Sequence, residues 1–221
     1  MLTFVTRSEW RARNPKAVTT IDLPTPELWL HHTAGSERGH EGMRAIQNYH
    51  MDVRGYNDIA YSFVVDPDTL KVYVGRGPGI QGGHTEGHNS ISHAICVMGN
   101  FDVMQPSNDL LATIAELINH GIKQSWWRGL SGGHRDASGA STACPGKYLY
   151  AEINRIRLYQ TTTDGDEEVT EEQMDQLGAW MQEQRALAVK EILTAINSTG
   201  RGSIKAKLNR LLDHAGIGHD A

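Results

Sequence analysis

Short apolar runs alternate with segments of helical spacing along residues 1–160 of the chain. Runs at 28–32, 61–65, 70–74 and 94–98 are continuous and too short for amphipathic helices, so they predict buried strands. Asp66-Pro-Asp68 lies between the second and third runs, and its residue types predict the turn of a hairpin. These runs therefore predict a sheet with at least one antiparallel pair.

Three segments carry apolar residues at helical spacing. The first spans about 40–52, and the second follows Ser107-Asn-Asp109, whose side chains are typical of a helix N-cap. The third follows Cys144 and continues through Leu149, Ile153 and Ile156. Since strands and helices are interleaved, the pattern predicts an α/β fold with a mixed central β-sheet and flanking helices.

The composition changes after residue 160. Residues 161–169 are polar and acidic, which is typical of a linker, and residues 170–221 carry two amphipathic stripes that predict a small C-terminal helical segment. We therefore predict one domain at 1–160 and a helical tail at 170–221. The apolar stripes of the tail need a covering partner, which is the first domain, a second copy of the chain in a homo-oligomer, or another surface.

Charge and hydropathy exclude two classes of partner. Residues 1–160 hold 15 basic and 15 acidic side chains, and residues 161–221, the linker and the tail together, account for the whole net charge of −5. Without a basic stripe, binding to nucleic acid by phosphate neutralisation is not expected. No run is long enough to span a bilayer and the N-terminus does not resemble a signal sequence, so we expect no membrane insertion and a cytoplasmic location with Cys96 and Cys144 reduced.

One loop places two metal-binding side chains at its ends. His134 and Cys144 flank a stretch of small residues, and imidazole nitrogen and thiolate sulfur are ligands that Zn²⁺ prefers. A third ligand is available in His31 or His32, at the end of the first apolar run. Strand alternation sends these two rings to opposite faces, so we expect one of them at most to join the other ligands.

Five segments together resemble one known family. They are Thr6–Ala12, Leu30–Ala34, His84–Asn89, Gly99–Asp102 and Gly133–Gly146. In this order and spacing they resemble the zinc-dependent N-acetylmuramoyl-L-alanine amidases, which include amidase-type phage lysozymes and the peptidoglycan recognition proteins. The resemblance covers about residues 2–158. It implies a peptidoglycan hydrolase whose zinc-activated water cleaves the amide bond between N-acetylmuramic acid and L-alanine.

The resemblance also implies a role for individual residues. These are His31, His134 and Cys144 as zinc ligands, Tyr61 and Thr142 as catalytic groups, and His84 and Asn89 as substrate-binding groove residues. Thr142 stands where some members carry an oxyanion-stabilising lysine, and a hydroxyl is a weaker electrostatic group. His32 is then expected in the core, while His40, His50 and His88 are expected to be structural or exposed. The separation of His134 and Cys144 is two residues longer than is usual in the family, and we expect the excess at 137–141 to bulge outward.

Three functions remain open on the sequence alone. The leading one is a phage endolysin, held in the host cytoplasm until lysis and then acting on the cell wall. A non-catalytic peptidoglycan-binding module is the second, although loss of zinc in that class usually replaces the cysteine, and Cys144 is present. The third is a lysozyme that also regulates a polymerase, which rests on the resemblance only. In each case the tail could bind the wall, form oligomers or pack against the first domain.

Overall fold

The computed structural model describes residues 2–162, and most of the predicted linker and all of the predicted tail lie outside these residues. Its strands are β1 (Phe4–Val5), β2 (Glu27–His32), β3 (Phe63–Val65), β4 (Val72–Val74), β5 (Ser92–Val97) and β6 (Gly132–Gly133). Its helices are α1 (Gly39–Asn48), a π-helical turn (Tyr49–Val53), α2 (Asn108–Lys123), a 3₁₀ turn (His134–Asp136), α3 (Lys147–Ala151) and α4 (Ile153–Thr162). The helix α4 thus extends two residues into the predicted linker.

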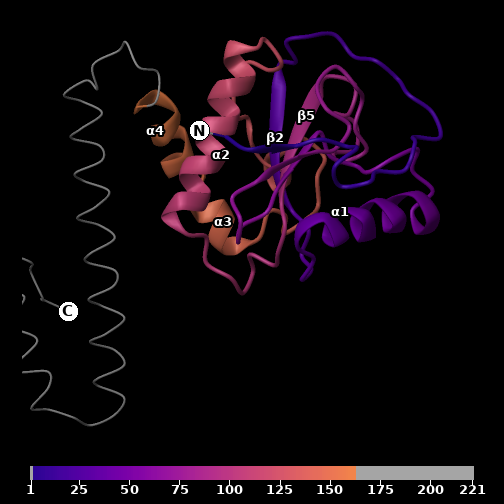
Figure 1. Cartoon of the computed structure of the whole chain (residues 1–221). Helices are drawn as coiled ribbons and strands as arrows, with labels where there is room; N and C mark the ends of the chain where they lie inside the picture. Colours follow the sequence, from indigo (N-terminus) through magenta and orange to yellow (C-terminus); the bar gives the residue numbers. More distant parts are fainter. Residues whose placement is uncertain (1, 163–221) are drawn as a thin grey trace, which may run out of the picture. The chain divides into compact units, whose positions relative to one another are not determined.

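The strands form one mixed sheet in the order β1-β4-β3-β5-β2-β6. The hairpin of β3 and β4 is antiparallel, and the other neighbouring strands are parallel. The helix α1 covers one face of the sheet, and α2 and α4 cover the other (Figure 1). The predicted fold class, a mixed sheet with flanking helices, is confirmed.

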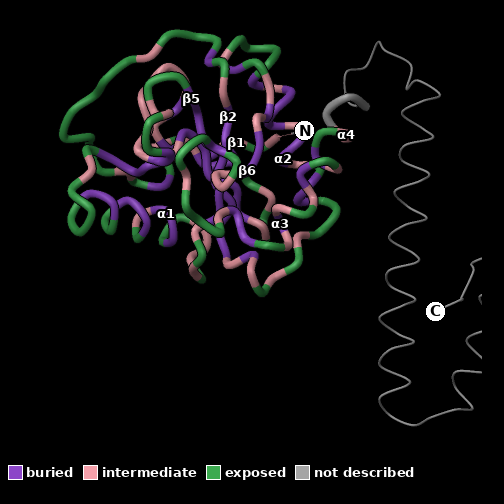
Figure 2. Tube along the Cα trace, turned by 180° about the vertical axis from the view of Figure 1, so that it is seen from behind, coloured by how far each residue is buried: buried purple, intermediate pink, exposed green. Residues whose placement is uncertain are grey.

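The two faces of the sheet bury two separate sets of side chains. Strand alternation directs Ile95 and Val97 of β5 toward α2, while Cys96 between them faces α1. The buried strands run through the middle of the domain, with the exposed loops outside them (Figure 2). His31, near the end of β2, is paired with Cys96 of β5 in the parallel register. Its imidazole therefore points to the same side as Cys96, toward α1.

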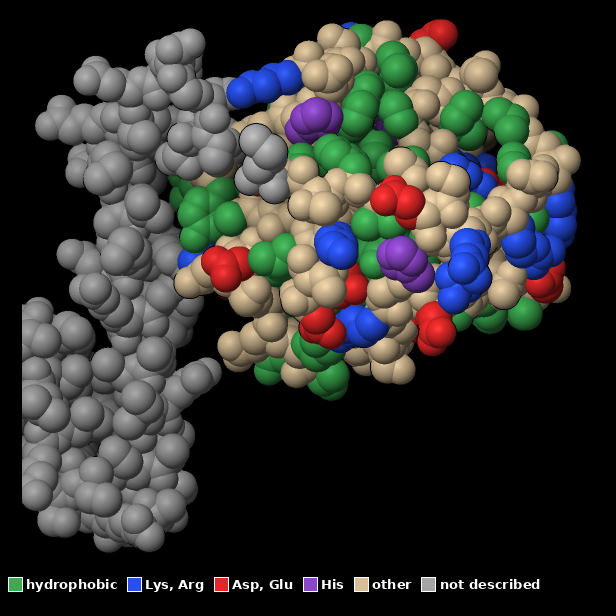
Figure 3. Space-filling model, in the orientation of Figure 1, with side chains coloured by type: hydrophobic (Ala, Val, Ile, Leu, Met, Phe, Trp, Pro, Cys, Tyr) green, Lys and Arg blue, Asp and Glu red, His purple; other side chains and the backbone are tan. Residues whose placement is uncertain are grey.

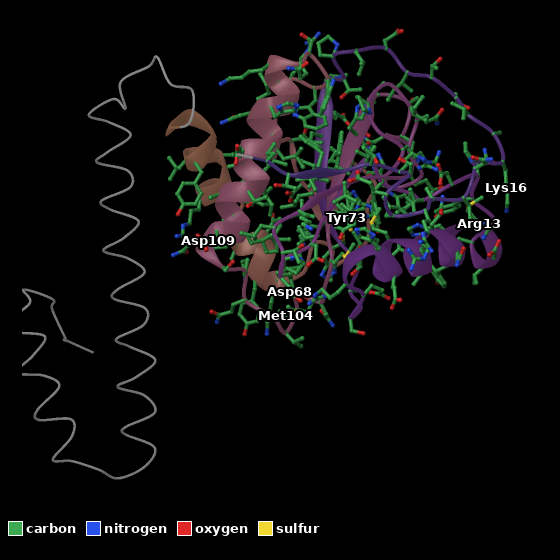
Figure 4. All side chains as sticks on the ribbon, viewed as in Figure 1. Arg13, Lys16, Asp68, Tyr73, Met104 and Asp109 are labelled. Atoms are coloured by element: carbon green, nitrogen blue, oxygen red, sulfur yellow. The ribbon has the colours of Figure 1, made fainter. Side chains whose placement is uncertain are left out.

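The helix α1 is held at both of its ends. Near its start, the Arg38 guanidinium donates to the Asp68 carboxylate at 2.9 Å. Beyond its end, Arg13 forms an ion pair of 2.6 Å with Asp52, and Lys16 donates to a nearby backbone carbonyl. Figure 4 shows Arg13 and Lys16 at one end of α1 and Asp68 at the other. These ties fix α1 along the face of the sheet that carries His31.

The structure differs from the predicted elements in several places, and the strands predicted at 61–65 and 70–74 are shortened to 63–65 and 72–74. Two strands, β1 and β6, were not predicted, because one has two residues and the other consists of glycine alone. The single helix expected after Cys144 is two helices, α3 and α4, with Glu152 between them. The predicted cap of α2 is confirmed, since Ser107 Oγ accepts from the amide of Leu110 at 3.2 Å.

The described surface has mixed charge. Basic and acidic side chains are interspersed on the face in Figure 3. Within residues 2–162, no helix has both the length and the apolar character needed to cross a membrane.

Candidate metal centre and groove

The three predicted zinc ligands meet at one edge of the sheet. His31 lies at the end of β2, His134 follows directly after β6, the strand paired with β2, and Cys144 lies in the next loop. Their ligand atoms lie within 4.8 Å of one another. His31 Nδ1 and Cys144 Sγ are 3.5 Å apart, and a tetrahedral zinc ion places such a nitrogen and sulfur about 3.5 Å apart. The donor set and its spacing therefore fit a zinc ion.

The hydrogen bonds of His31 assign its ring nitrogens. Nδ1 faces Cys144, and Nε2 lies 3.3 Å from Thr85 Oγ1, which in turn lies 3.0 Å from His84 Nδ1. If Nδ1 keeps its lone pair for a metal, Nε2–H donates to Thr85, and the Thr85 hydroxyl donates to His84. Burial lowers the pKa of His31 well below its ordinary value, so the ring is neutral, as a ligand must be.

Arg135 closes the loop that brings Cys144 to His134. Its amide donates to the Cys144 carbonyl at 3.1 Å, and its guanidinium donates to the carbonyl of Ala143. At the start of the loop the chain passes so close to Pro145 that a Cβ at Gly133 would lie 2.5 Å from the proline Cδ. Only glycine fits there, so this residue allows the two ends of the loop to approach.

Metal-free Cys144 is a thiol. Burial raises its pKa to about 11, so binding of a zinc ion requires loss of this proton.

The neighbouring His32 has the opposite role from His31. It is buried, as expected for it, and its Nδ1 accepts from the amide of Phe101 at 3.1 Å, while the residue also borders the main cavity.

Tyr61 lies beside the cluster. Its ring centroid is 5.4 Å from that of His31, and both residues line one cavity of about 740 Å³. Burial raises the pKa of Tyr61 well above its usual range, and the adjacent thiols of Cys96 and Cys144 add to the effect. The phenol therefore keeps its proton and is a hydrogen-bond donor. Cys96 is fully buried, as expected for a small core residue.

A second hollow of about 430 Å³ continues the first. The two share Arg54, Tyr56, Gly83, His84, His134 and Thr142, and the residues that the second adds include Glu86 and Asn89. One wall is the segment that follows α1, and the opposite wall is the loop at 139–142. Together they form a groove that passes the metal cluster. His50, expected to be structural, is buried in the wall of the main cavity and accepts from the amide of Ala60.

The remaining predicted residues lie in this groove and also order its loops. Thr142 Oγ1 accepts from the amide of Cys144 at 3.1 Å, so its hydroxyl holds the ligand loop. Asn89 Oδ1 accepts from the amides of His84 and Thr85 at 2.8 and 3.0 Å. The side-chain carbonyl of Asn89 is thus engaged by its own loop.

Sequence reasoning missed Thr85 and Arg135. Thr85 lies inside the His84–Asn89 motif. Its hydroxyl, next in sequence to a predicted groove histidine, could have indicated a hydrogen-bonding role in the site. Arg135 follows a predicted ligand, but nothing in the sequence indicates that its side chain binds carbonyls eight and nine residues further along.

The fold is a mixed α/β domain, and its described residues include one set of two histidines and a cysteine that could hold a metal ion. The chain belongs to the N-acetylmuramoyl-L-alanine amidase family, whose sequence profile matches residues 23–147. Peptidoglycan-recognition protein SD of Drosophila simulans is 33% identical over 162 residues, which are 69% of this chain and 84% of that protein. Human N-acetylmuramoyl-L-alanine amidase is 34% identical over 142 residues, which are 59% of this chain and 24% of that protein.

A solved structure supports the same assignment. Human PGRP-IBETAC in complex with glycosamyl muramyl pentapeptide matches with a TM-score of 0.62 at 30% identity, over 68% of this chain and 94% of that chain. The family predicted from the sequence is therefore confirmed.

Proposed function

We propose that this protein is a peptidoglycan amidase that hydrolyses the bond between N-acetylmuramic acid and L-alanine. One observation carries the proposal: the side chains of His31, His134 and Cys144 line the same cavity, and their ligand atoms are close enough together to bind one zinc ion. When bound, a zinc ion supplies a Lewis acid that polarises a carbonyl and lowers the pKa of water.

The chain's own residues hold and complement this centre. Thr85 fixes the His31 ring by accepting from Nε2, and Arg135 fixes the Cys144 loop. The protonated Tyr61 phenol is a preorganised donor for an oxyanion that develops beside the cluster. Thr142 keeps Cys144 in register, and its hydroxyl proton remains available to a substrate oxygen in the groove.

The groove suits a branched ligand of sugar and peptide. It is far larger than one amide group, it runs past the metal cluster, and its walls offer the cationic Arg54, the aromatic Tyr56 and the acidic Glu86. The solved complex of a relative with glycosamyl muramyl pentapeptide supports a ligand of this class.

The test is digestion of purified peptidoglycan by the full-length, zinc-loaded protein, followed by mass spectrometry. We expect stem peptides that begin with L-alanine. Chelation of zinc or the substitution Cys144→Ser should reduce their release to background, while the circular dichroism spectrum of Cys144→Ser at a permissive temperature shows that the variant is still folded. Release at the wild-type rate by Cys144→Ser would contradict the proposal.

A second candidate, recognition without cleavage, predicts a different result. The wild type would then retain peptidoglycan in a pull-down and release no stem peptide. The intact donor set favours the amidase, because a pure binding module has no need of two histidines and a thiol at this spacing.

The role as an endolysin extends the proposal and rests on the family resemblance. It predicts that the protein stays in the cytosolic fraction of expressing bacteria, and that lysis begins when the membrane is permeabilised. Lysis that precedes permeabilisation would contradict it. The predicted roles of the tail in wall binding or homo-oligomerisation stay predictions.

A further inference from the structure

The loop at 137–142 determines one wall of the groove. Ser138, Gly139, Ser141 and Thr142 are exposed, and the segment 139–142 borders the second hollow. The ends of the loop are held, since Ala137 bonds back to His134 and Arg135 binds the carbonyls before and at Cys144. Between these ends, His88 reaches the loop from another segment, with Nε2 lying 3.1 Å from the Ser138 carbonyl oxygen.

His88 is also anchored to the strand that carries a predicted zinc ligand. Its Nδ1 lies 2.7 Å from Glu27 Oε2, at the start of β2. The same carboxylate oxygen accepts from Trp29 Nε1 at 3.0 Å, and the Trp29 ring packs edge-on against the His88 ring at 5.7 Å. Three contacts therefore fix the orientation of the imidazole, which bridges β2 and the loop.

Both partners of the His88 ring are acceptors. A carbonyl oxygen never donates, and an ionised carboxylate does not donate either. A neutral imidazole has one N–H and one lone pair, so in this geometry its lone pair would face an oxygen. Both contacts are satisfied together only when both ring nitrogens carry protons.

The buried histidines have the reverse arrangement. His32, His50 and His93 each accept a backbone N–H, from Phe101, Ala60 and Gly79 at 3.0–3.1 Å, and each is held neutral by that bond. Burial lowers the pKa of all three. The contact geometry thus separates His88 from these rings.

We propose that His88, as an imidazolium, is a positioning residue that clamps the 137–142 loop to β2 and so sets the width of the groove. The effect of this clamp on the binding of a sugar-peptide substrate rests on the proposed function. The clamp itself depends only on His88, Glu27 and the Ser138 carbonyl.

The clamp has a defined pH dependence. The hydrogen bond with Glu27 raises the pKa of His88 above the ordinary 6.5. Its contribution is complete below about pH 6.5 and is lost as the pH rises through the raised value. Glu27 is the charged group that faces His88 from β2. His134 is the titratable group on the loop side, and its pKa is lowered by burial and then by the charge of His88.

The test follows the ring and the loop in full-length protein, without substrate. The pKa of His88 is measured by NMR in the wild type and in Glu27→Gln, and amide-exchange protection of residues 137–142 is measured across pH 5.5–8.5. We expect a pKa above 6.5 that falls in Glu27→Gln, and loop protection that decreases in step with the titration. His88→Phe keeps the ring contact with Trp29 and should leave the loop unprotected at every pH. His40→Phe, which removes an exposed histidine of α1, is the matched control and should behave as the wild type.

Kinetics then separate positioning from chemistry. At pH 6, His88→Phe should raise KM for a soluble muropeptide roughly tenfold, the scale of one charge-assisted hydrogen bond, with kcat and zinc content unchanged. A pKa of His88 at or below 6.5, or loop protection and KM unaffected by His88→Phe, would overturn the inference. If the ring and loop titrate together but no variant cleaves peptidoglycan, the clamp is supported and the amidase proposal fails.

Discussion

The two faces of the sheet are buried to similar depth but are held by different forces. Toward α2, the contacts are made by apolar side chains such as Leu111 and Ile114, which are fully buried. Toward α1, apolar contacts are mixed with polar ones, such as the bond from Gln47 to the buried Asp58 at 2.6 Å. The first face contributes stability through area and packing. The second face also buries polar side chains, which hold one another in place through hydrogen bonds.

Two histidines on neighbouring strands show a further difference between the faces. His93 on β5 faces α2 and uses both ring nitrogens, with Nε2 accepting from Gly79 at 3.0 Å and Nδ1 lying 3.0 Å from Thr25 Oγ1. His31 on β2 faces α1. Its Nε2 lies 3.3 Å from the Thr85 hydroxyl, whereas its Nδ1 lies beside the Cys144 sulfur. A ring with both nitrogens engaged is structural, and a ring with one nitrogen left beside a thiol can bind a metal.

The largest effect should come from a cavity on the α2 face. Leu111→Ala removes a fully buried side chain, and we expect a loss of about 2–5 kcal/mol in the free energy of unfolding. Zinc content and kcat at a permissive temperature should not change. Urea denaturation of the full-length protein measures the loss, with Val103→Ala as a control because Val103 is 73% exposed. Loss of zinc binding in folded Leu111→Ala would show that the two faces are not independent.

Tyr61→Phe should have the converse effect on the α1 face. Removal of an oxyanion donor is expected to lower kcat by roughly 10²–10³, while zinc content and the melting temperature stay at wild-type values. Metal analysis and steady-state kinetics on one preparation provide both readouts. If zinc content falls in parallel with kcat, Tyr61 supports the ligands and is not a donor to the substrate.

Thr85→Val should give a smaller effect on the metal itself. The substitution keeps the shape of a buried residue but leaves His31 Nε2–H without its acceptor, so we expect zinc affinity to fall by about 10–100-fold. Competition with a chromophoric chelator measures this affinity. Thr113→Val is the matched control, since that hydroxyl bonds to a carbonyl within α2. Equal affinities in the two variants would refute the role of Thr85.

The smallest effect concerns acid stability on the α2 face. Burial lowers the pKa of His93 in the folded protein to about 4. As the pH falls below 6.5, this imidazole is therefore protonated in the unfolded chain while it stays neutral in the folded one. Stability contributed by the neutral ring is therefore present above pH 6.5 and is lost between pH 6.5 and 4, and its loss at pH 5.5 is about 1 kcal/mol. Denaturation of the wild type and His93→Gln at pH 7.5 and 5.5 should show a weaker pH dependence in the variant. The same dependence in both proteins would contradict this assignment.

Much of the architecture follows from local pattern. The apolar run that became β5 and the capped amphipathic segment that became α2 can each be predicted from a few neighbouring residues, and His134 and Cys144 lie at the two ends of one short loop. His31 is 113 positions from Cys144 and was selected as the third ligand through the family resemblance. The bridge from Glu27 to His88 is not, because it joins residues 61 positions apart, and neither side chain has an unusual neighbour in the sequence. The glycine strand β6 was missed for a related reason: it is a strand because β2 pairs with it, and glycine has no strand propensity of its own.

The separation of the cluster along the chain has a topological consequence. His31 and Cys144 are 113 residues apart, so an ion that joins them closes a loop containing most of the described domain. For a covalent link of about 100 residues, the chain-entropy estimate of stabilisation is about 4.7 kcal/mol, and a bound ion acts in the same direction as long as it remains attached to both ends. A zinc ion bound at the proposed centre would therefore also cross-link early and late parts of the polypeptide, and we expect its removal to lower the stability of the fold as well as the proposed activity.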